Sequence, residues 1–392
     1  MKWASTLSTA TRFETAVREA AAGIKEKLGG AAPDFAALFV SQSFANRRDD
    51  IQEAVAKHLP ARVLIGASAA GVIGGGREWE SKAGLSLVAA VLPDVKLRPF
   101  AIQDEDLPDL DDSPRAWESL VGVRAAEDPQ FVVLADPFSI RLDNLLAGLD
   151  YAFPRSAKIG GVASGAAEPG HGSLYLNDQC LRGGVVGVAF TGNLRIDTVV
   201  SQGCRPIGRP LRVTGCKENA LLAVDGKPPV EILQNLFKEL SDRDRQLLRQ
   251  ALFLGIAMTS STEAPQPGDF LVRNIVGVDN DHGYLAVAAS LRLGQTVQFH
   301  LRDARASLDD LRQVFARVQG RGASPHGAML FSCVGRGQSL YGKPDHDSAF
   351  FQETVGPVPL GGFFCNGEIG PVGGTTYLHG YTSCFGLFRA KT

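Results

Sequence analysis

The most informative stretch of the chain is GGFFCNGEIGPVGG, Gly361–Gly374, which is followed by LHGYT, Leu378–Thr382. It places a thiol, an amide, a carboxylate and an imidazole among closely spaced glycines. Glycine allows a backbone to turn sharply or to approach a ligand closely, because it carries no Cβ. We therefore expect recognition or chemistry in this segment.

Two earlier segments follow the same pattern, in which a short apolar strand ends in glycine and small polar residues. They are IGAS at residues 65–68 and IGGVAS at residues 159–164, and the corresponding part of the opening stretch is FCNG at residues 364–367. Three related loops suggest internal pseudo-symmetry. The abundance of glycine, with 44 in the chain, offers an alternative explanation.

Hydrophobic periodicity predicts alternating helices and strands along most of the chain. The order favours a mixed α/β (α+β) fold of two modules, built from αβαβ–glycine loop–ββ units with mixed sheets. Ser241–Arg245 reads as a charged connector and Ser260–Gly268 as an exposed loop. The expected helices are 12–28, 47–58, 115–126, 142–151, 230–240, 308–318 and 348–354; the expected strands are 35–40, 62–65, 84–91, 95–102, 131–135, 157–161, 183–190, 195–201, 251–258, 270–277, 284–288, 295–301, 328–332, 359–364 and 380–388.

Four further strings occur in order with the opening stretch, at residues 65–71, 202–208, 294–303 and 331–337. Together the five strings resemble the FIST family, sensory domains named after F-box and intracellular signal transduction proteins. The resemblance covers most of the chain and implies an N-terminal FIST module at 1–203 and a C-terminal module at 204–392. It also implies ligand sensing, with amino acids among the proposed ligands and no established catalytic reaction.

Composition narrows the classes of protein. A length of 392 residues favours two domains, and a formal net charge of −2 supplies no basic excess for nucleic acid or anionic lipid. No apolar run reaches the roughly 20 residues of a membrane span, and the first residues lack a secretory signal pattern. Six cysteines without a Cys-x-x-Cys pair indicate reduced thiols. We expect a cytoplasmic protein without membrane or nucleic-acid partners.

The sensor hypothesis requires a pocket with a few convergent polar groups. Arg336 could bind a ligand carboxylate and Glu368 a ligand ammonium, a combination that suits an amino acid or similar zwitterion. No output region is recognisable, so a separate signalling protein is the expected partner; no cofactor or metal is expected. The predicted ligand-binding residues are Ser68, Arg205, Cys333, Arg336, Cys365, Asn366, Gly367, Glu368, His379 and Tyr381.

Two alternatives remain open. The first is an enzyme that uses Cys365 or Cys333 as nucleophile, with His346 or His379 as base. The second is a protein-interaction scaffold, as the F-box relatives imply. A zinc site is disfavoured because His346 and its two flanking aspartates lack a second ligand at tetrahedral spacing. The glycine-rich segment at residues 71–77 matches neither the Walker pattern nor the dinucleotide-binding pattern.

Overall fold

The computed structural model describes residues 1–258, 265–318, 320 and 323–391; residues 260–264 of the predicted exposed loop therefore lie outside it. The chain forms two compact units. Unit 1 comprises Met1–Val200, Val314–Leu378 and the residues from Thr382 onward, and unit 2 comprises Ser201–Gln313 and His379–Tyr381. The boundary expected at residues 203/204 lies close to the start of unit 2, and the chain returns to unit 1 at Val314.

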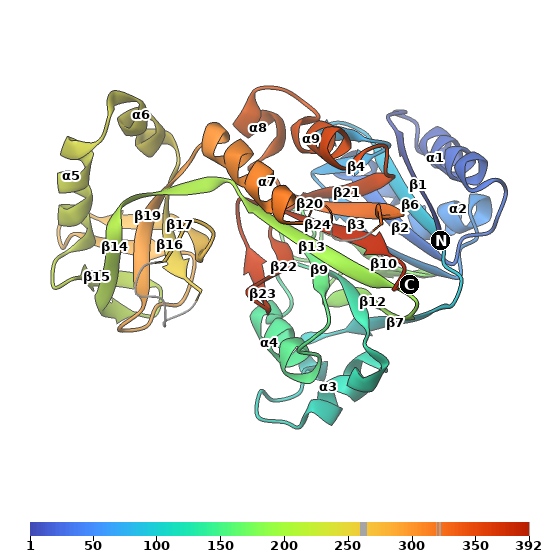
Figure 1. The fold of residues 1–392 in the computed structure, drawn as a ribbon, viewed down its shortest axis with the longest axis horizontal. Helices are drawn as coiled ribbons and strands as arrows, with labels where there is room; N and C mark the ends of the chain where they lie inside the picture. The colour runs from blue at the N-terminus through green and yellow to red at the C-terminus, as the bar shows by residue number, and fades with distance from the viewer. Residues whose placement is uncertain (259–264, 319, 321–322, 392) are drawn as a thin grey trace. The chain divides into compact units, whose positions relative to one another are not determined.

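Elements before Val200 and after Gln313 build unit 1 (Figure 1). The helices are α1 (Phe13–Leu28), α2 (Ile51–His58), α3 (Pro114–Val121), α4 (Leu142–Ala152), α8 (Gly337–Tyr341) and α9 (His346–Val355). A further helix, α7 (Ala304–Val318), begins in unit 2 and ends in unit 1. The strands are β1 (Lys2–Ser8), β2 (Phe35–Ser41), β3 (Val63–Ala69), β4 (Gly71–Gly74), β5 (Arg77–Glu80), β6 (Leu85–Val91), β7 (Val95–Ile102), β8 (Gln130–Ala135), β9 (Lys158–Val162), β10 (Leu174–Leu176), β11 (Gln179–Leu181), β12 (Val185–Gly192), β13 (Arg195–Gln202), β20 (Gly327–Cys333), β21 (Leu360–Cys365), β22 (Glu368–Val372), β23 (Thr375–His379) and β24 (Thr382–Arg389).

Within the described residues, three six-stranded sheets repeat one plan: β1-β6-β2-β3-β10-β11, β23-β22-β9-β8-β12-β7 and β13-β24-β20-β21-β4-β5. The parallel pairs β2/β3, β8/β9 and β20/β21 lie at the centres, and β6, β12 and β24 run antiparallel beside them. We call β1–β6 the first repeat, β7–β12 the second, and β13 with β20–β24 the third. Each sheet receives a hairpin from another repeat; β4–β5 of the first repeat, for example, completes the third sheet. The mixed sheets and the internal pseudo-symmetry are thus confirmed, as an exchange of strands among three repeats.

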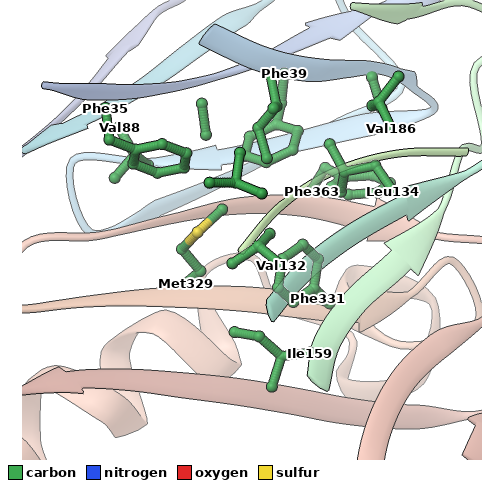
Figure 2. Packing of buried hydrophobic residues seen from close by; sticks show 14 of the residues in the cluster. Phe35, Phe39, Val88, Val132, Leu134, Ile159, Val186, Met329, Phe331 and Phe363 are labelled. Atoms are coloured by element: carbon green, nitrogen blue, oxygen red, sulfur yellow. The ribbon is translucent and has the colours of Figure 1, made fainter. Parts of the chain in front are cut away.

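The inner faces of the three sheets share one hydrophobic core (Figure 2). Along β2, Phe35 and Phe39 enter this core, while Leu38 faces the opposite side against α1 and α2. Phe39 meets Phe331 of β20 at 6.5 Å between ring centroids, in an edge arrangement. Strands buried on both faces read as continuous apolar runs, which is why they were predictable from sequence.

A glycine recurs at one register position in all three sheets. Gly66 pairs with Leu38, Gly160 with Val133, and Gly362 with Leu330. A Cβ at any of these glycines would overlap the carbonyl oxygen of its partner. The repeated pattern of apolar strand and glycine loop therefore has a steric cause, and the three loops occupy equivalent places.

Within the described residues, unit 2 is a closed barrel in the order β14-β15-β18-β17-β16-β19, accompanied by α5, α6 and the first part of α7. Its elements are β14 (Cys204–Lys217), β15 (Ala220–Val224), α5 (Pro229–Glu239), α6 (Asp242–Gln250), β16 (Leu252–Ala257), β17 (Phe270–Asp279), β18 (Tyr284–Val287) and β19 (Thr296–Arg302). The prediction of a connector at Ser241–Arg245 was wrong, because α6 begins there. Ser241 Oγ accepts a hydrogen bond from the Asp244 N–H and so caps this helix.

No helix in the described parts of the chain is long and apolar enough to cross a membrane.

Candidate functional site

A pocket of about 410 Å³ opens at the carboxyl ends of the parallel strands β8 and β9; we call it the β8–β9 pocket. Ligands of α/β proteins commonly bind at this end of a parallel pair. The pocket lies beside the start of α4. Its lining residues are Asp136, Pro137, Ile140, Arg141, Leu142, Asp143, Asn144, Val162, Asn366 and Leu378.

Asp136 shapes the floor of the pocket, since it follows β8 directly and is only 4% exposed. Its Oδ2 accepts hydrogen bonds from the Phe138 N–H, at 3.0 Å, and the Ser139 hydroxyl, at 2.7 Å. Ser139 Oγ in turn accepts the Gly184 N–H at 2.7 Å. This chain of bonds fixes the strand-to-helix loop and keeps a carboxylate at the bottom of the hollow.

Arg141 and Asp143 supply opposite charges at the start of α4, where both side chains are exposed. The backbone N–H of Arg141 donates to Asp104 Oδ1 at 2.7 Å, and its Nε contacts Asp104 Oδ2 at 3.0 Å. An exposed ion pair of this kind contributes little to stability but holds the guanidinium in place. The pocket therefore presents carboxylates and a cation within one hollow.

Asn366, from the third glycine loop, reaches the same pocket. Its backbone N–H donates to Val162 O at 3.0 Å, and Val162 N–H donates to Gly367 O at 2.8 Å. Its Nδ2 donates to Ala163 O at 3.3 Å, and the side chain is otherwise exposed. Among the predicted residues, Asn366 is the one that the structure places in the pocket lining, with Gly367 holding its loop against β9.

Ser164 ties the three glycine loops together. Its hydroxyl accepts the Ala70 N–H at 2.9 Å and donates to Phe364 O, while the neighbouring Gly165 N–H donates to Ser68 O at 3.1 Å. Ser68 is 9% exposed, and its Oγ accepts the Ser173 N–H at 2.9 Å. Ser68 thus serves this junction and is absent from the lining of the β8–β9 pocket.

Asp136 and Ser164 were missed by sequence reasoning. A signal for Asp136 existed, because a carboxylate directly after an apolar strand and before Pro137 is typical of a turn that leads into a helix. Ser164 was quoted as part of the second glycine loop. Its bridging role depends on loops from distant parts of the chain and had no local signal.

The equivalent place in the third repeat is filled by polar side chains, which we call the β20–β21 cluster: the buried Arg336, His346, Asp347 and Glu78, and the half-buried Tyr341. Arg336 has 0% exposure, and its Nε donates to Asp347 Oδ2 at 3.0 Å. Arg336 Nη2 donates to Tyr341 Oη at 2.6 Å, and His346 Nδ1 lies 2.9 Å from Asp347 Oδ1. Burial alone would raise the pKa of Asp347, but the Arg336 charge and these hydrogen bonds hold it below its usual range.

Glu78 enters this cluster from β5 and caps α9. Its Oε1 accepts the Ser348 N–H at 2.7 Å and the Ser348 hydroxyl at 3.0 Å. Burial, reinforced by the Asp347 charge, raises the pKa of Glu78 to about 8. Although several carboxylates gather here, no group of three His, Cys, Asp or Glu side chains is arranged to hold a metal ion within the described residues.

The cysteines proposed as nucleophiles are buried: Cys365 is 0% exposed and Cys333 is 6% exposed. Cys365 Sγ lies 3.5 Å from Phe363 O, and burial raises the pKa of this thiol well above its ordinary value. A neutral, enclosed thiol is a poor nucleophile. Glu368 is likewise 0% exposed, and its Oε2 accepts the Thr382 N–H at 3.1 Å.

The remaining predicted residues, Arg205, His379 and Tyr381, belong to unit 2. Arg205 Nε donates to Asp303 at 2.9 Å, and its Nη2 contacts Asp244 of α6. Tyr381 Oη donates to Asn274 at 2.6 Å, while its ring lies 4.2 Å from that of Phe253. His379 is 3% exposed. Arg205 thus connects α6 to the barrel, and Tyr381 packs against the barrel strands β16 and β17.

Two family models match the chain. The FIST N domain matches residues 34–227, and the FIST C domain matches residues 229–371. The chain belongs to the FIST family. The two matches confirm the family indicated by the five sequence strings. FIST domains are generally sensory domains of signal transduction.

Relatives of this FIST protein occur in bacteria and plants. An uncharacterised protein of Mycobacterium tuberculosis is 34% identical over 97% of this chain and 98% of its own length. An F-box/LRR-repeat protein of Arabidopsis thaliana is 25% identical over 65% of this chain and 54% of its length. A cyanuric acid hydrolase structure from A. caulinodans aligns over 100% of this chain and 99% of its own, at 8% identity and a TM-score of 0.37, too low to support an inference.

Proposed function

We propose that this FIST protein is a cytoplasmic sensor whose small-molecule ligand occupies the β8–β9 pocket. The observation that carries the proposal is the hollow of about 410 Å³ at the carboxyl ends of two parallel strands, lined by Asp136, Arg141 and Asn366. This volume falls within the range of small-molecule sites, roughly 300–1,000 Å³. The six free cysteines are in keeping with a reducing compartment.

The proposed ligand is an amino acid or a similar zwitterion. Asp136 and Asp143 offer acceptors for an ammonium group, while Arg141 and the amide of Asn144 offer donors for a carboxylate. Asn366 places a further amide at the wall. The signal that ligand is bound then reaches a separate signalling protein, which must bind the ligand-bound arrangement of the loops with a different affinity from the free arrangement.

A thermal-shift screen of the full chain against the twenty amino acids tests the proposal, because a ligand that binds the folded state raises the melting temperature. We expect at least one saturable hit, and at least a tenfold rise in Kd for Asn366→Ala and Asp143→Asn. Asp111→Asn, an exposed acidic residue outside the pocket, is the matched control. A flat screen, or a hit that both pocket variants leave unchanged, would overturn the assignment.

A further inference from the structure

Unit 2 contains a second hollow, of about 350 Å³, between α5 and the strands β14 and β19. None of its lining residues belongs to the β8–β9 pocket. They are Ile207, Gly208, Arg209, Leu211, Ile232, Asn235, Leu236, Glu239 and Phe299. We call it the barrel pocket.

A break in the ladder of β14 creates this space. The pairing of β14 with β19 shifts register between Ile207 and Leu211, so the intervening residues bulge from the strand. Gly208 has φ +62°, and its carbonyl accepts the Gln298 Nε2–H at 2.7 Å, which holds the bulge open. A Cβ at Gly208 would lie 3.2 Å from Leu236 Cδ1 and would narrow the entrance.

The floor of the barrel pocket is apolar. Ile207, Leu211 and Phe299 are at most 5% exposed and belong to the barrel core. Ile232 and Leu236 extend this surface from α5, yet both are only half-buried, and the one fully buried residue described on α5 is Pro229. A ligand that covered these side chains would remove further apolar surface from water, at about 25 cal/mol per Å².

The charges on the rim are unequal. Arg209 Nη2 already pairs with Asp225 Oδ2 at 2.7 Å, and Asn235 Oδ1 lies 3.4 Å from Lys238 Nζ. Glu239, in contrast, has no ion-pair partner in the part of the chain that the structure describes. The charge left for a ligand to neutralise is therefore a carboxylate.

We propose that the barrel pocket binds a small hydrophobic amine. Its aromatic or branched aliphatic body would lie on Phe299 and Leu236, with its ammonium group at Glu239 and the Asn235 amide. The site is independent of the β8–β9 pocket. It would give this FIST protein a second input, of a different chemical class from the zwitterion proposed for unit 1.

Isothermal titration of the full chain with 2-phenylethylamine, 2-phenylethanol and 3-phenylpropanoate tests the proposal, since these probes share an aromatic body and differ in charge. We expect saturable binding of the amine, at least fivefold tighter than the alcohol and tighter still than the carboxylate. Glu239→Gln should weaken amine binding threefold to tenfold and leave the alcohol unchanged. Glu231→Gln, on the same helix but outside the pocket, should change neither.

Two further variants locate the site. Ile232→Lys, at a half-buried position, removes apolar surface from the pocket and adds a charge of the same sign as the amine, so it should abolish binding of both the amine and the alcohol while circular dichroism stays unchanged. Asn366→Ala should leave amine binding intact, so that failure here is separable from failure of the unit 1 proposal. Absence of amine binding, preference for the carboxylate, or indifference to Glu239→Gln would each overturn the inference.

Discussion

The β8–β9 pocket and the β20–β21 cluster occupy equivalent places in the three-repeat plan, yet one is hollow and the other is filled. The register of the strand pairs aligns Val133 of β8 with Leu330 of β20, because each pairs with the equivalent glycine. Three residues further on, Asp136 therefore corresponds to Cys333. Three residues later the second repeat has Ser139 and the third has Arg336. The small side chain closes a turn and leaves space, whereas the long one folds inward and recruits Asp347.

This difference shows how one backbone plan can give either a binding hollow or an internal ion-pair network. Charge crowded among glycines led the sequence reasoning to Arg336 as the cation for a ligand. In the structure its guanidinium is 0% exposed and has an internal carboxylate partner. The ligand proposal rests instead on the β8–β9 pocket, to which Asn366 of the third glycine loop contributes an exposed side chain.

The largest effect should come from breaking the filled site. Asp347→Ala leaves the Arg336 guanidinium buried without its counter-charge, so we expect unit 1 to lose about 3–5 kcal/mol of unfolding free energy. Urea unfolding followed by tryptophan fluorescence measures this, since the three tryptophans, Trp3, Trp79 and Trp117, all lie in unit 1. The double variant Arg336→Met/Asp347→Leu should recover much of the loss. A single-variant loss below 1 kcal/mol would mean that the cluster is not structural.

A smaller effect, with a defined pH dependence, is expected at Glu78. Because its pKa rises from 4.5 to about 8 on folding, the folded state holds a proton that the unfolded state releases between these values. Its contribution to stability is full below pH 4.5 and is lost as the pH rises through 8. Glu78→Gln keeps an acceptor for Ser348 but does not titrate.

The wild type should therefore lose on the order of 2 kcal/mol relative to Glu78→Gln between pH 6.5 and pH 9. Unfolding curves of both proteins at several pH values provide the measurement. Glu53→Gln, an exposed site on α2, should follow the wild type. Parallel curves for the wild type and Glu78→Gln would show that Glu78 is ionised throughout.

The smallest stability change is expected in the hollow site. Asn366→Ala removes one 3.3 Å hydrogen bond from an exposed side chain, so its unfolding free energy should stay within about 0.5 kcal/mol of the wild type. The same urea titration serves as the measurement. A loss comparable to that of Asp347→Ala would erase the contrast between the two places and mark Asn366 as a structural residue.

The rate at which each cysteine is alkylated tests whether the third glycine loop holds a reactive thiol. Cys365 should react with iodoacetamide at pH 8 far more slowly than the half-buried Cys180 and Cys216, because burial removes access and raises the pKa of its thiol. Mass spectrometry of the native protein at successive times would identify the labelled peptides. Rapid labelling of Cys365 would restore the cysteine-enzyme alternative.

Much of the fold could be predicted because its central strands are buried on both faces, as in β2, and therefore carry unbroken apolar runs. The exchanged hairpins were missed, since β10 and β11 have 3 residues each and join a sheet only through the pairing of β10 with β3 of another repeat. The 14-residue strand β14 was missed because it contains Pro206, Gly208 and Pro210, which are residues that usually argue against a strand. For the site, sequence could supply Asn366 but not the pairing of Arg336 with Asp347, which depends on how α9 packs.

The exchange of hairpins also affects how the protein is made. The β4–β5 hairpin leaves the ribosome early, but Ile73 pairs with Gly362 of β21, which is synthesised after the Ser201–Gln313 part of unit 2. At typical rates of translation the hairpin waits on the order of tens of seconds for that strand. During this interval its unpaired edge is exposed to other nascent chains, and a ribosome stalled before β21 would release a chain with an incomplete third sheet. Yield in a cell should therefore depend on chaperones that shield the hairpin until translation is complete.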